Sequence, residues 1–242
     1  MTTELPRLQT MALESAPPAP WLWRGLLAPH TLTLMHGTPR VGKTTMTAAL
    51  LASSRQGGDL AGLPVRKARA LVLTQDSAEQ WRQSVPGFRL DKHVCYLCRP
   101  PRGGAADEGQ ALLEHVRDLT QVFAFDLVVL DPFSAFMPAR PASLARLRTL
   151  ADTGVAVLLV HDEPGDRTSL LTLTAAADIV VELTATANTR QRRLSIGSRF
   201  ADSPHSLVLE LNPAGKAYRC IIEEEKPPAR AARSPHTRRG VG

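Results

Sequence analysis

The chain has 242 residues, of which 43% are hydrophobic and 21% charged, enough for one globular domain with extensions. No apolar run approaches the roughly 20 residues that span a bilayer, and the N-terminus lacks a secretory signal pattern, so we expect a cytoplasmic protein without a membrane segment. Three cysteines exclude a disulfide scaffold. Most of the net charge of +6 lies in residues 226–242, which leaves the rest of the chain almost neutral.

The chain divides into three parts by composition. Residues 1–20 have little apolar periodicity and end in a proline-rich stretch, so we interpret them as a flexible arm. Residues 226–242 are rich in proline and arginine, which predicts a disordered basic tail. The remaining segment, 21–225, is expected to fold as one domain.

From residue 31 onward, short apolar runs alternate with helical stretches. Strands are predicted at 31–36, 70–75, 93–97, 126–131, 155–161 and 178–183. Helices are predicted at about 42–55, 77–84, 107–122 and 142–152. The strand runs are apolar throughout, which is typical of a parallel sheet covered by helices on both faces. The final third predicts antiparallel strands at 192–200, 206–212 and 216–224, so we expect an α/β fold with a mostly parallel sheet and an antiparallel C-terminal extension.

The most specific motif lies between the first strand and the first helix. It matches the phosphate-binding pattern GxxxxGK[ST] at every position: Gly37, Thr38, Pro39, Arg40, Val41, Gly42, Lys43 and Thr44, followed by Thr45. Backbone N–H groups of such a loop point at the phosphates of ATP, and the glycines allow close approach. Lys43 can reach the β- and γ-phosphates, and the Thr44 hydroxyl can bind Mg²⁺.

An acidic residue at the end of a second strand is expected to complete this site. Asp131 follows four apolar residues and is the candidate that holds Mg²⁺ or its water. Residue 132 is proline, so no glutamate follows Asp131. This disfavours the arrangement in which the catalytic acid lies beside the metal-binding aspartate.

Several further segments occur in a characteristic order: RALVLTQDS, DLVVLDPFSAF, GVAVLLVHD and RRLSIGSRF. With the phosphate loop, they resemble the RecA-type P-loop ATPases, in particular the branch of RepA-like hexameric helicases and their bacterial AAA-type relatives. The resemblance covers about residues 19–211. It implies a RecA-like core, ATP hydrolysis with Mg²⁺, a homo-oligomer such as a hexamer or filament, and action on DNA.

The resemblance also implies roles for four residues outside the loop. The family places a water-activating glutamate where this chain has Gln75, and an amide cannot accept a proton. Either the adjacent Asp76 takes over this role, or hydrolysis is slow and the protein works mainly as an ATP-bound binder. His161 matches a residue that senses the γ-phosphate, with Asp162 replacing the next family residue. Arg199 matches an arginine that reaches the nucleotide of a neighbouring subunit.

Two loops are the candidates for contact with DNA. The loop after Asp131 is basic, with Arg140 followed by Arg146 and Arg148, which suits phosphates. The loop after His161 is short and acidic, which does not. Mainly from the resemblance and the basic tail, we expect an ATPase acting on DNA, more readily single-stranded, as a helicase or a recombination or replication accessory. The alternative is a nucleotide-gated module that binds DNA or protein with weak or no hydrolysis.

Overall fold

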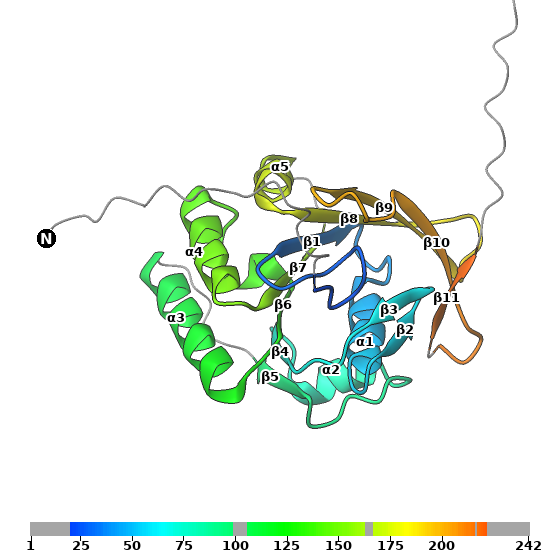
Figure 1. Ribbon diagram of the computed structural model, residues 1–242, viewed down its shortest axis with the longest axis horizontal. Helices are drawn as coiled ribbons and strands as arrows, with labels where there is room; N and C mark the ends of the chain where they lie inside the picture. The colour runs from blue at the N-terminus through cyan, green and yellow to red at the C-terminus, as the bar shows by residue number, and fades with distance from the viewer. Residues whose placement is uncertain (1–19, 99–105, 163–166, 216, 222–242) are drawn as a thin grey trace, which may run out of the picture.

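The computed structural model describes residues 20–98, 106–162, 167–215 and 217–221 (Figure 1). The predicted tail, and all but the last residue of the predicted arm, lie outside these ranges.

Nine strands form one sheet in the order β11-β10-β9-β8-β1-β7-β6-β4-β5. The parallel strands are β1 (Leu32–Gly37), β4 (Ala70–Thr74), β5 (Val94–Cys98), β6 (Leu127–Asp131), β7 (Ala156–Asp162) and β8 (Ile179–Ala185). The antiparallel strands are β9 (Gln191–Ser198), β10 (Ser206–Leu211) and β11 (Tyr218–Ile221). The predicted α/β class, the six parallel strands and the antiparallel C-terminal extension are confirmed.

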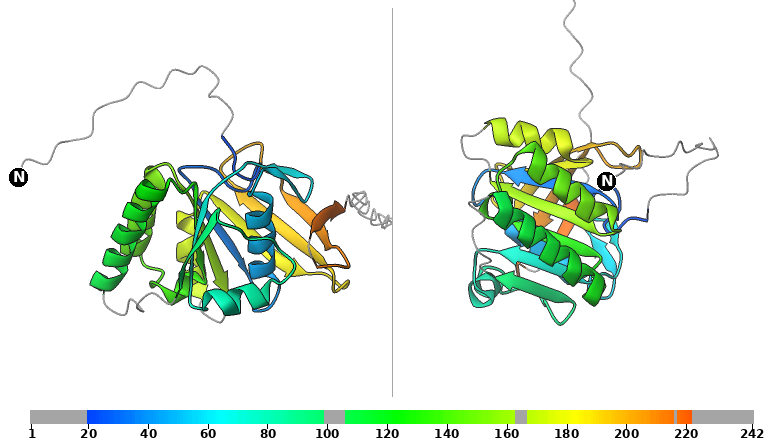
Figure 2. Two further views of the ribbon diagram at one scale, coloured as in Figure 1. Left: turned by 90° about the horizontal axis from the view of Figure 1, so that it is seen from below. Right: turned by 90° about the vertical axis from the view of Figure 1, so that its left-hand side faces the viewer.

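Helices cover both faces of the sheet (Figure 2). Helices α1 (Lys43–Ser53) and α2 (Ala78–Ser84) pack on one face. Helices α3 (Ala106–Phe123), α4 (Pro141–Asp152) and α5 (Arg167–Ala176) pack on the other, next to the short 3₁₀ turn η1 (Phe133–Ala135). None of the helices in the described ranges is long and apolar enough to cross a membrane.

Two features of the fold were not predicted. Helix α5 is rich in threonine, a poor helix former, and it is held by burial of Leu173 against the sheet. The hairpin of β2 (Gly58–Leu60) and β3 (Leu63–Val65) has strands of only three residues, too short to show a period. In both cases tertiary contacts outweigh a weak local signal.

The central strand β1 shows why the apolar runs are continuous. Met35 faces the layer of α1 and α2, whereas Leu32 and Leu34 face the layer of α3, α4 and α5. All three side chains are buried. A strand between two helical layers needs apolar residues on both sides, because successive side chains point to opposite faces.

Asp178, just before β8, connects three elements of the fold. Its Oδ2 accepts the backbone N–H of Leu32 at 2.9 Å and a guanidinium hydrogen of Arg148 at 2.6 Å. Its Oδ1 accepts a hydrogen bond from Arg199 at 3.2 Å. The carboxylate is mostly buried, so these partners compensate for its loss of hydration.

We predict that Asp178→Ala lowers the free energy of unfolding by about 3 kcal/mol, because it leaves a buried N–H and a half-buried guanidinium without their acceptor. The matched control is Asp152→Ala, which removes an exposed carboxylate at the end of α4 and should change stability by less than about 0.5 kcal/mol. Urea unfolding of both variants provides the measurement. Equal losses would contradict the assigned role of Asp178.

Candidate functional site

The phosphate-binding motif forms the turn between β1 and α1. A Cβ atom added at Gly37 would lie 2.3 Å from the carbonyl oxygen of Leu183 in β8, so glycine is required by the neighbouring strand. Gly42, the residue before α1, has a φ of 107°, which favours glycine. Both glycines are therefore needed to form the loop itself, in addition to the predicted approach of a phosphate.

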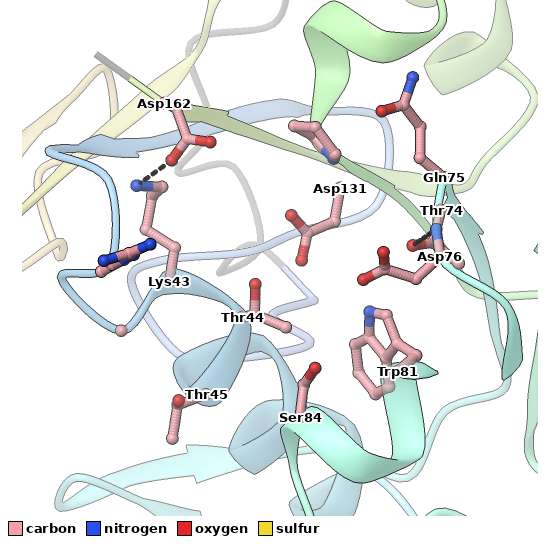
Figure 3. Close-up of a pocket in the computed structure, with 13 residues that line it drawn as sticks. Lys43, Thr44, Thr45, Thr74, Gln75, Asp76, Trp81, Ser84, Asp131 and Asp162 are labelled. Carbon is pink, nitrogen blue, oxygen red and sulfur yellow. Dashed lines mark hydrogen bonds and ion pairs between the residues drawn. The ribbon is translucent and has the colours of Figure 1, made fainter. Parts of the chain in front are cut away.

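Lys43 is buried at the first turn of α1, with 5% of its side chain exposed. Its ammonium group donates hydrogen bonds to the carbonyl oxygens of Gly37 at 2.8 Å and Thr38 at 2.9 Å. It also forms an ion pair with Asp162 Oδ1 at 2.6 Å (Figure 3). The loop thus encloses its own lysine, and a carboxylate from the end of β7 supplies the anionic partner.

A cleft of about 490 Å³ opens beside this loop. It brings together eight of the predicted residues: Arg40, Gly42, Lys43, Thr44, Thr45, Gln75, Asp76 and Asp131. It adds five more: Thr74, Trp81, Ser84, Pro132 and Asp162. The cleft lies at the carboxyl ends of β1, β4, β6 and β7, the usual position for a ligand in an open α/β sheet.

Asp131 ends β6 and is almost fully buried in the cleft wall. Burial raises its pKa from 3.8 to about 6; the hydrogen bond from the Thr44 hydroxyl and the charge of Lys43 act in the opposite direction, and the charges of Asp162 and Asp76 add to the increase. Its Oδ2 atom is buried and has no hydrogen-bond partner among the described residues. A carboxylate with an unused oxygen beside a threonine hydroxyl fits the oxygen ligands of Mg²⁺.

Gln75 and Asp76 follow β4 and face different directions. The Asp76 carboxylate points into the cleft toward Thr44 and Asp131, whereas the Gln75 amide points away from them (Figure 3). The backbone N–H of Asp76 donates to the Thr74 hydroxyl at 3.2 Å. A capping box between Ser77 and Gln80 then starts α2, which limits the freedom of this turn.

Six predicted residues do not line this cleft: Gly37, Thr38, Pro39 and Val41 of the loop itself, and His161 and Arg199 outside it. His161 is buried on β7 in register with His36 of β1, and both lie on the face of Leu34 and Leu159, away from α1. Arg199 follows the end of β9 that pairs with the start of β8, the edge of the sheet opposite to the phosphate loop. Within one chain its partner is Asp178. The sensor role of His161 and the intersubunit role of Arg199 remain predictions.

The sequence analysis missed the contribution of α2 to the cleft. Trp81 is buried in the cleft wall, where its ring packs against Tyr96 at a centroid distance of 5.3 Å. Ser84 lines the cleft one turn further along α2. The capping-box spacing from Ser77 to Gln80 was the available signal, because it locates the first turn of the helix after β4.

The arginines expected to meet DNA have partners within the chain. Arg148 binds Asp178, and Arg146 donates to the Gln110 side chain at 3.0 Å. Arg140, just before α4, is exposed. Most of the second loop, residues 163–166, lies outside the described residues. The basic character of the first loop therefore rests mainly on Arg140.

We predict that Asp131→Asn becomes more stable relative to the parent as pH rises from 4 to 7, in EDTA without nucleotide. The pKa of Asp131 is about 6 in the folded protein and 3.8 in the unfolded chain. The protonated carboxyl therefore contributes fully to the free energy of unfolding below pH 3.8, and this contribution is lost as pH rises through about 6. Asparagine carries no such charge, so the gain between pH 4.5 and 7.5 should be about 2 kcal/mol. Melting at pH 4.5 and 7.5 measures it, with Asp152→Asn as the exposed control. If the difference in stability between Asp131→Asn and the parent does not change with pH, the raised pKa of Asp131 is contradicted.

Comparison with solved structures shows the same fold in a protein of remote sequence. The flagellar accessory protein FlaH from Methanocaldococcus jannaschii matches with a TM-score of 0.60 and 12% identity, over 81% of this chain and 91% of that one. The α/β core with its mostly parallel sheet and antiparallel C-terminal strands is thus RecA-like. No curated protein matches the chain significantly in sequence.

The family comparison covers the segment that contains the phosphate loop, Asp76, Asp131 and Asp162. The AAA domain model AAA_25 matches residues 2–167, about two thirds of the chain. Nucleotide and Mg²⁺ binding are general properties of such P-loop domains. The chain belongs to the AAA_25 family of AAA domains.

Proposed function

We propose that this protein is a Mg²⁺-dependent ATPase that binds ATP in the cleft between the phosphate loop and α2. One observation carries the proposal: Lys43, Thr44 and Asp131, predicted separately from two distant motifs, line the same cleft. The buried Asp131 oxygen without a partner and the hydrogen bond from Thr44 supply the oxygen environment that a Mg²⁺–nucleotide complex requires.

The start of α1 is the proposed phosphate cradle. No side chain caps this helix, so its first N–H groups remain available to an anion. Asp162 holds the Lys43 ammonium group in an ion pair, and a γ-phosphate is a second anion for the same group. ATP binding should therefore separate Lys43 from Asp162. Magnesium held at Thr44 and Asp131 would neutralise charge that develops on the transferred phosphate.

Asp76 is the proposed general base. Its carboxylate points into the cleft, while the Gln75 amide points away from Asp131 and cannot accept a proton. This supports the hypothesis of a displaced base over that of a naturally slow enzyme. Trp81 and Ser84 close the wall beside Asp76.

We further propose that ATP turnover controls a macromolecular partner, with single-stranded DNA as the first candidate. The resemblance to RepA-like helicases and the exposed Arg140 support this choice, whereas the internal partners of Arg146 and Arg148 weaken it. The alternative is a nucleotide-gated module that binds DNA or protein with weak or no hydrolysis. Assembly into a homo-oligomer, with Arg199 acting on a neighbouring nucleotide, belongs to the same proposal.

We predict that Lys43→Ala weakens ATP binding in Mg²⁺ by about 10- to 100-fold, because it removes a charge-assisted contact to phosphate. The control variant Lys67→Ala removes an exposed lysine outside the cleft and should bind like the parent. Titration calorimetry measures both. Turnover with and without single-stranded DNA then separates the candidates: stimulation supports a DNA-dependent ATPase, and unchanged turnover supports the gated module. A parent protein that binds no ATP would refute the function.

We predict that Asp76→Asn lowers kcat by about 10²- to 10⁴-fold while ATP affinity persists, as expected for loss of a positioned base. Gln75→Glu should change kcat little, because this side chain points away from Asp131. Glu79→Gln, on the exposed side of α2, is the control. Steady-state ATP hydrolysis measures all three. A gain from Gln75→Glu without a loss from Asp76→Asn would instead indicate a naturally slow ATPase.

A further inference from the structure

Arg192 of β9 reaches back to the phosphate loop, although about 150 residues separate them in the sequence. Its Nε donates to the carbonyl oxygen of Val41 at 2.5 Å. Its Nη1 donates to the carbonyl oxygens of Thr189 at 2.8 Å and Gln191 at 2.7 Å. These bonds fix the guanidinium between the β9 turn and the loop. No carboxylate of the described residues forms an ion pair with it.

The contact lies on the outer side of the loop, away from the cleft. A Cβ atom added at Gly42 would lie 3.6 Å from Arg192 Nε and 3.8 Å from the Tyr218 hydroxyl. Tyr218 of β11 is buried, and burial raises the pKa of its hydroxyl above the usual value of 10, with the Arg192 charge acting in the opposite direction. Residues of β9 and β11 thus lie directly behind the peptide between Val41 and Gly42.

Because of the geometry of the peptide group, the hydrogen bond to the Val41 carbonyl also sets the direction of the Gly42 N–H. A trans peptide is planar, so its C=O and N–H bonds point in opposite directions. When Arg192 holds the Val41 carbonyl on the outer side, the Gly42 N–H faces the inner side, where Gly42 lines the cleft. With the carbonyl turned inward instead, an oxygen would repel the phosphates.

An external support is needed at this position because glycine places little restriction on its own backbone. Gly42 accepts its unusual φ of 107°, but the same freedom permits other orientations of the peptide. The arginine charge also lies behind the loop, which favours an anion in front of it.

We propose that Arg192 is a positioning residue that orients the Gly42 N–H toward the β-phosphate of the nucleotide. The inference rests on the proposed function, and it adds a requirement that lies outside the phosphate-binding motif. Since ATP and ADP both carry a β-phosphate, Arg192 contributes equally to the binding of both. It holds the phosphate alike in the ground state and in the transition state, so it acts on KM and leaves kcat unchanged.

The test compares Arg192→Ala and Arg192→Lys with the control Arg190→Ala, which removes an exposed arginine from the same hairpin. We expect Arg192→Ala to weaken ATP and ADP equally, by about tenfold, with kcat within twofold of the parent. Arg192→Lys can still donate to Val41 and should recover part of the affinity. Calorimetry and steady-state hydrolysis provide the measurements.

Three results would overturn the inference: unchanged affinity in Arg192→Ala, an equal loss in Arg190→Ala, or a fall in kcat with KM unchanged. If Arg192→Ala does not fold, Arg192→Met decides, because it keeps the apolar part of the side chain without a hydrogen-bond donor, and parental affinity for both nucleotides would overturn the inference. If the parent binds ATP and the Arg192 variants bind it with the same affinity, only the role of Arg192 is refuted. A parent that binds neither nucleotide refutes the proposed function as well.

Discussion

Parallel pairing of β1 with β7, and of β6 with β4, is the constraint on which the site depends. Parallel strands direct their carboxyl ends to one edge of the sheet, and residues that follow those ends must meet there. Lys43, Asp76, Asp131 and Asp162 lie at or after the carboxyl ends of four different strands and line one cleft for this reason. The helical layers on both faces keep the strands in register, so the geometry of the cleft depends on the whole core.

Charge is the second feature that organises the cleft. The cleft contains the buried ammonium group of Lys43 and three carboxylates, those of Asp76, Asp131 and Asp162. Burial and the two neighbouring acids raise the pKa of Asp131, so its charged form is costly without a cation. In the proposed function, a divalent cation would offset this excess of negative charge, and a phosphate would draw Lys43 away from Asp162. Cation and nucleotide binding are therefore expected to be coupled.

The antiparallel extension does more than enlarge the sheet. Strands β9 and β11 bring Arg192 and Tyr218 against the outer side of the phosphate loop, and β9 leads to Arg199 at the opposite edge. The archaeal FlaH structure shares this architecture at 12% identity, which establishes the fold alone.

The sequence alone identified the phosphate-binding motif, the candidate Asp131 and the positions of the main strands along the chain, because glycine spacing and apolar runs are local patterns that need no distant partner. Only the tertiary structure decided that Asp76 faces the cleft, that Asp162 pairs with Lys43, and that Arg192 supports the loop. It also shows that Arg148 and Arg199 form ion pairs with Asp178 of the same chain. These contacts join residues far apart in sequence, so their geometry exists only once the sheet has brought the strand ends together.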